Sequence, residues 1–77
     1  MDKITGTNSA RRALENGDIR IGTILTDASG IYRIISIDEH SDIVCEAAEL
    51  DWGFDDFTET GTVHRWTIGD LIGKEGM

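Results

Sequence analysis

The feature that most constrains the fold is a run of short strand-like segments that begins at Arg20. Residues 20–26 and 31–37 are rich in β-branched side chains, which favour strands. The residues between them, 27–30, are typical of a hairpin turn, and we expect Gly30 to take the left-handed position of that turn. Because the segment 31–37 has apolar side chains on both faces, it is predicted to be a central, curved strand.

Two further strands are predicted downstream. Residues 43–50 indicate a third strand, although the Glu-Ala-Ala-Glu sequence within them would also suit a helix and would then make the fold α+β. After a loop at 51–59, residues 60–66 indicate a fourth strand. Thr67 and Asp70 have the spacing of a capping box, which predicts a single helical turn after that strand.

The two ends of the chain are predicted to be less regular. Residues 1–7 are polar and are interpreted as a flexible arm. Asn8 is a suitable N-cap for a short helix at 8–17, which should stop with Gly17 in the C′ position. Residues 73–77 are expected to be a frayed tail.

These segments make the chain one mainly β domain spanning residues 1–77. Four or five short strands in so small a chain close most economically into a barrel. Residues 20–72 resemble an SH3-like barrel in outline, through the opening Gly22-Thr23-Ile24-Leu25, the following hairpin, Tyr32 in the second strand and Trp66 before one helical turn. We therefore expect a small four- to five-stranded SH3-like barrel with a short N-terminal helix and a C-terminal single helical turn.

The acidic residues are unevenly distributed along the chain. The formal net charge is −8, from 15 acidic and 7 basic residues. Nine of the acids lie between Arg33 and Arg65 with no lysine or arginine among them, so this segment alone carries −9. They are Asp38, Glu39, Asp42, Glu46, Glu49, Asp51, Asp55, Asp56 and Glu59. Proteins bind nucleic acid through Lys and Arg, so this segment predicts no direct nucleic-acid binding and a basic surface as partner.

The strongest candidate site is the predicted loop 51–59, where three aromatics are interspersed with four carboxylates. Aromatic residues often supply the dominant contacts of an interface, and carboxylates would steer a basic partner toward them. Alternatively, an aromatic closes the end of the barrel and the acids are only solvated; in either case we expect at least one of the three in the core. The predicted partner-binding residues are the nine acids together with Trp52, Phe54 and Phe57.

In size, charge and lack of motifs the chain is similar to small anti-CRISPR and anti-restriction proteins of phages. That resemblance implies a non-enzymatic protein-protein interaction module or inhibitor, whose acidic middle segment mimics nucleic acid on the basic surface of a nucleic-acid-processing or defence complex. The alternative is a small structural or assembly subunit, or an adaptor, that associates with itself or a larger complex through strand edges and exposed Trp52 or Trp66. The acidic segment could also be only a solubility feature.

Other chemistry has weak support in the sequence. The acids of 51–59 lack EF-hand spacing, and Cys45, His40 and His64 lack the paired spacing of a zinc site. His40-Ser41-Asp42 contains the letters of a hydrolytic triad, but consecutive residues cannot adopt its geometry. We therefore expect no enzymatic activity, no metal and no cofactor, and interpret Cys45 as a small core residue.

Localisation is inferred from cysteine content and hydropathy. A single cysteine cannot form an internal disulfide, and no secretory signal is recognisable at the N-terminus. The longest apolar runs are far shorter than the roughly 20 residues needed to cross a bilayer. These features predict a cytoplasmic protein that does not engage a membrane.

Overall fold

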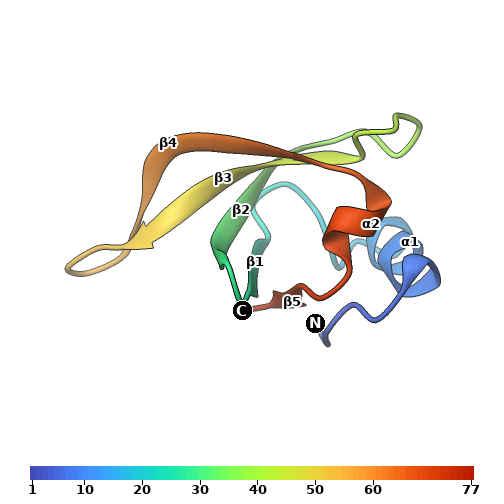
Figure 1. Cartoon of the computed structure of the whole chain (residues 1–77), viewed down its shortest axis with the longest axis horizontal. Coiled ribbons are helices and arrows are strands. Elements are labelled where there is room, and N and C mark those ends of the chain that lie inside the picture. The colour runs from blue at the N-terminus through green and yellow to red at the C-terminus, as the bar shows by residue number, and fades with distance from the viewer.

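The computed structural model describes all 77 residues, and its five strands form one open antiparallel sheet (Figure 1). The sheet order is β4-β3-β2-β1-β5. The prediction of a mainly β fold is confirmed. The elements in chain order are α1 (Thr7–Glu15), β1 (Ile24–Asp27), β2 (Gly30–Ile37), β3 (Cys45–Trp52), β4 (Phe57–Trp66), α2 (Ile68–Leu71) and β5 (Glu75–Gly76).

The predicted closure of the sheet into a barrel is wrong. β4 and β5 are the two edges of the sheet and do not pair with each other. The last strand has only two residues, and both pair with β1. The β3–β4 hairpin instead extends away from the body of the molecule, so its far end cannot reach β5 (Figure 1).

The central strands follow the predicted pattern. β3 is a strand throughout, so the alternative prediction of a helix for this segment is wrong. β2 lies in the middle of the sheet, between β1 and β3, as expected. Its pairing with β3 shifts register between Ile34 and Ser36, and such a bulge bends a strand.

The β1–β2 turn forms differently from the prediction, because Gly30 is not in the left-handed region. The Asp27 carboxylate organises the turn instead, accepting hydrogen bonds from the backbone N–H of Ser29 (2.8 Å) and of Gly30 (3.2 Å). Glycine is still favoured at position 30, because a Cβ there would lie 3.3 Å from the Tyr32 hydroxyl.

Neither end of the chain is the loose segment that the sequence suggested. Ile4 is buried, its N–H donates to the Lys74 carbonyl (2.8 Å) and its carbonyl accepts from Gly73 (2.7 Å). At the other end, residues 75 and 76 form β5, and Gly76 donates to the Met1 carbonyl (3.2 Å). The two polar-looking ends are therefore ordered by each other, through backbone hydrogen bonds that carry no side-chain signature.

The two helices begin as local side-chain chemistry dictates. The N-cap of α1 is Gly6, two residues before the predicted cap Asn8, and the Ser9 hydroxyl accepts from the N–H of Gly6 (3.1 Å). Its end is as predicted, with Gly17 at φ +82°. The capping box of α2 is also confirmed, since Thr67 N–H donates to the Asp70 carboxylate (2.9 Å) and Asp70 N–H to the Thr67 hydroxyl (3.3 Å).

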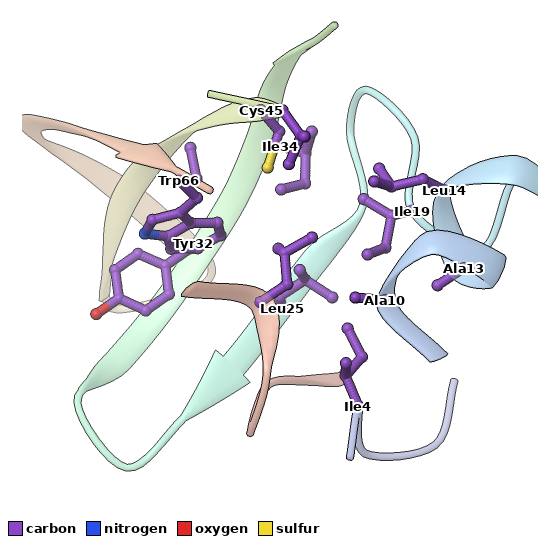
Figure 2. Close-up of a cluster of buried hydrophobic side chains, with 13 residues drawn as sticks. Ile4, Ala10, Ala13, Leu14, Ile19, Leu25, Tyr32, Ile34, Cys45 and Trp66 are labelled. Atoms are coloured by element: carbon purple, nitrogen blue, oxygen red, sulfur yellow. The ribbon is translucent and has the colours of Figure 1, made fainter. Parts of the chain in front are cut away.

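The hydrophobic core lies on the inner face of the sheet, which is the face covered by the two helices (Figure 2). It contains 13 buried residues, among them Leu14 of α1, Leu25 of β1 and Cys45, which was predicted to be a core residue. Tyr32 and Trp66 meet edge to face at 4.9 Å in this cluster. One face of the sheet is thus packed, and the helices leave the other uncovered.

Candidate functional site

The candidate site is the tip of the β3–β4 hairpin, at the far end of the molecule from the helices (Figure 1). The predicted loop 51–59 is shorter than expected, since only residues 53–56 lie outside the two strands. Gly53 donates its N–H to the Asp56 carbonyl (2.7 Å), and a Cβ at Gly53 would lie 2.5 Å from the same oxygen. The tight turn therefore requires glycine, and it holds the flanking aromatics in place.

The aromatic side chains at the tip are outside the core. Phe54 is 99% exposed and Trp52 is 69% exposed. Phe57 is half-buried and packs edge to face on Trp52, with ring centroids 4.8 Å apart. The expectation that at least one of these three aromatics joins the core is wrong, because all three lie at the hairpin tip and none belongs to the core cluster that contains Tyr32 and Trp66.

The tip also carries three exposed carboxylates that pair with no basic side chain. They are Asp51, Asp55 and Asp56. Asp56 accepts a hydrogen bond from the backbone N–H of Phe57 (2.7 Å), which fixes its direction. An apolar patch surrounded by free negative charge is chemically suited to a surface that offers an apolar recess and basic groups.

The other predicted acids do not lie together with the tip. Asp38, Glu39 and Asp42 are exposed in the β2–β3 connection, which is at the opposite end of the molecule (Figure 1). The longest dimension of the molecule is 36 Å. Six of the nine acids therefore form two separate exposed groups rather than one continuous surface.

The remaining three predicted acids lie within the sheet, each beside an arginine or a histidine. Glu46 approaches Arg65 (3.9 Å), Glu49 approaches His64 (3.2 Å) and Glu59 approaches Arg33 (3.4 Å), as their side-chain nitrogen–oxygen distances show. Hydrogen bonds from Thr60 and His64 hold the pKa of Glu49 below its usual range.

A buried ion pair that the sequence analysis missed lies on the inner face. Lys74 Nζ is 2.9 Å from the Asp27 carboxylate and 4.4 Å from the centre of the Trp66 ring, and it donates to the Asp70 carbonyl (2.6 Å). Burial raises the pKa of Asp27, but hydrogen bonds from Ser29 and Lys74 outweigh it and lower the pKa to about 2. All buried polar groups of this cluster have hydrogen-bond partners. The cluster therefore holds the C-terminal segment against the sheet. Nothing local in the sequence signals it.

The other surface features give less indication of a functional site. The largest hollow, about 360 Å³, lies between α1, the β2–β3 connection and α2, and is lined by Arg11, Asp42 and Thr67 among others. No three His, Cys, Asp or Glu side chains converge as metal ligands would. Neither helix has the length and apolar character that a membrane crossing requires.

Comparisons with known proteins return no relative: no family model, no curated protein and no solved structure matches this chain. Any functional inference therefore depends on the chemistry of the residues themselves.

Proposed function

We propose that this chain is a protein-binding module that docks through the tip of its β3–β4 hairpin. The observation that carries the proposal is the exposure of Phe54 and Trp52, at 99% and 69%, on a tight turn flanked by three unpaired carboxylates. Exposed aromatics are the residues most often found at the energetic centre of interfaces. Burying them on a partner would remove a large apolar area from water.

The partner that best complements this tip has an apolar recess bordered by lysine and arginine. Nucleic-acid-binding surfaces are rich in such basic groups, and the −9 charge of the segment between Arg33 and Arg65 would compete for them. We therefore favour an inhibitor that occupies the basic surface of a nucleic-acid-processing or defence complex. The acids at 38–42 would add long-range attraction without direct contact.

The test is affinity capture from a lysate of host cells with three matched chains. The tip variant replaces Asp51, Asp55 and Asp56 with Asn, which keeps their shape and removes three charges. The control variant removes three charges at the opposite end, with Asp38→Asn, Glu39→Gln and Asp42→Asn. Each capture is washed at low and at high salt, and bound proteins are identified by mass spectrometry.

We expect wild type and the control variant to retain a nucleic-acid-binding protein that the tip variant loses, and added DNA or RNA to displace it. Phe54→Ser should lose it as well, whereas Ile72→Ser, a change at another exposed apolar residue, should not. A partner retained equally by all of these chains would show that the tip is not the binding site.

A structural or assembly subunit is the second candidate, because the outer edge of β4 has no strand partner. The pairing of β4 with β3 shifts register between Ala48 and Leu50, and Gly61 lies opposite that shift at φ +94°. Bulges at sheet edges oppose strand addition, which makes this edge a poor template over its full length. An edge contact would survive high salt, whereas a contact made by the acidic tip would weaken.

A further inference from the structure

The uncovered face of the sheet, which we call the outer face, carries a second set of apolar side chains. The strand register places Ile31 beside Leu50, and Ala48 beside Val63, on this face. Ala48 and Leu50 are each 4% exposed, yet neither belongs to the core cluster. They are covered only by neighbouring side chains of the sheet, and Val63 remains 50% exposed.

No other element of the chain packs on the outer face. The helical residues that are buried, Ala10, Ala13, Leu14 and Leu71, all belong to the core cluster on the inner face. A sheet face with this many apolar residues is usually covered in a stable fold. On this face Val63 is left half exposed, and a contact from outside the single chain would cover it.

The charges on the outer face favour one kind of partner for it. Arg33 pairs with Glu59 (3.4 Å) and Arg65 with Glu46 (3.9 Å), so the charges around Leu50 and Val63 balance. Glu75 at the β5 edge, opposite Thr26, adds one exposed negative charge to this face. The whole chain carries −8. A basic partner gains little from a face whose charges are nearly balanced and is better matched by the acidic ends. A second copy of the chain, which is repelled elsewhere, meets the least repulsion at the balanced region around Val63.

We propose that two copies of this chain pack against each other through their outer faces. In a two-fold arrangement each arginine of one copy can meet a glutamate of the other, because the face is self-complementary in charge. Val63, together with the methylene groups of the Arg33–Glu59 pair above Leu50, would supply the contact, as in other sheet-on-sheet packings. This proposal does not depend on the function proposed for the tip.

The pairing has a consequence for the hairpin tips. Trp52 and Phe57, the last strand pair, share the outer face with Leu50, and Phe54, Asp55 and Asp56 lie in the turn beyond them, so a dimer centred on Val63 leaves the turn of each tip free. Two linked binding elements raise the effective concentration at a partner with repeated or symmetric sites.

The test is sedimentation equilibrium of the full chain from micromolar to millimolar concentration, at about 0.1 M and about 1 M NaCl, where the Debye length falls from roughly 10 Å to roughly 3 Å. We expect the mass to rise from 8.5 kDa toward twice that value, and the association to be stronger at high salt. The salt response is opposite to that of the tip contact, so failure of one proposal cannot be mistaken for failure of the other.

Val63→Glu should keep the chain at 8.5 kDa wherever wild type is dimeric, and Ile72→Glu, at a comparably exposed residue beyond α2, should leave the dimer intact. If circular dichroism shows that Val63→Glu is unfolded, Val63→Thr keeps the shape and should raise the dissociation constant by about tenfold. A chain that is monomeric under all conditions, or a dimer that is indifferent to changes at Val63, would overturn the proposal.

Discussion

Arg33 and Glu59 form an ion pair across a strand to which neither belongs. Arg33 lies on β2 and Glu59 on β4, and β3 runs between them. Their register partners on β3 are Ala48 and Leu50, so the two side chains meet over the outer side of that strand. The pair covers apolar surface with its methylene groups while its charged ends remain partly hydrated.

This geometry predicts that the apolar residue beneath contributes more stability than the ion pair above it. Leu50→Ala should lower the free energy of unfolding by about 2–4 kcal/mol. Glu59→Gln should change it by less than about 1 kcal/mol, because a pair this exposed gains little over hydration. Urea unfolding of dilute protein, followed by tryptophan fluorescence, measures both values. A larger loss for Glu59→Gln than for Leu50→Ala would contradict this account.

The Asp27 carboxylate makes stability depend on pH in the acid range. Its pKa is lowered from 3.8 to about 2 in the folded state, so its contribution is fully present above pH 3.8 and is lost as the pH falls through about 2. The difference corresponds to about 2 kcal/mol. We expect Asp27→Asn to lose this amount at neutral pH and to approach wild-type stability near pH 2.

The control for this prediction is Asp55→Asn, since Asp55 is exposed and makes no ion pair. Its stability should follow wild type at every pH. Urea unfolding at a series of pH values compares the three chains. If the free energies of unfolding of wild type and Asp27→Asn differ by the same amount down to pH 2, the carboxylate acts through its shape rather than its charge.

The Asp27–Lys74 pair should be strongly coupled in a double-mutant cycle. Lys74 is 8% exposed, so Lys74→Met leaves the Asp27 carboxylate without its charged partner in a region with little water. We expect each single change to cost more than half of what the double change Asp27→Asn with Lys74→Met costs, with a coupling energy of about 1–3 kcal/mol. Additive losses would mean that the two groups stabilise the fold independently.

Cys45 should be unreactive in the folded protein. Burial raises the pKa of its thiol to about 11, an effect that the Lys74 charge reduces and the Asp70 charge adds to. Thiolate is the reactive form, so alkylation by iodoacetamide at pH 8 should be at least about a hundredfold slower than in denaturant. Mass spectrometry of timed samples measures the rate. Rapid modification of the native chain would show that β3 opens near Cys45.

The features that were predicted correctly are those determined by residues close together in the sequence. Gly17 ends α1, Thr67 and Asp70 cap α2, and residues 43–50 were predicted to be a strand despite their helix-tolerant centre. The two helix boundaries each depend on residues within four positions of one another. The N-cap was predicted two residues late, at Asn8 instead of Gly6, because the Ser9 hydroxyl was not recognised as the acceptor for the N–H of Gly6.

Contacts between distant segments could not be predicted in the same way. Lys74 lies beside Asp27 and Trp66 only because β5 pairs with β1, and a two-residue strand has no periodicity to detect. For the candidate site, the sequence indicated the composition of the tip. It could not separate the acids that project into solvent from Glu46, Glu49 and Glu59, because strand register brings bases beside only these three.

The hydrogen bond between Gly76 and Met1 brings the start and the end of this chain side by side (Figure 1). Any label or fusion partner attached at either end therefore emerges from one corner, far from Phe54. The same closeness allows the two ends to be joined by a short linker and new ends to be opened at the hairpin turn. Such a permuted chain would keep every strand pairing of the sheet while its β3 and β4 were no longer covalently connected at the tip.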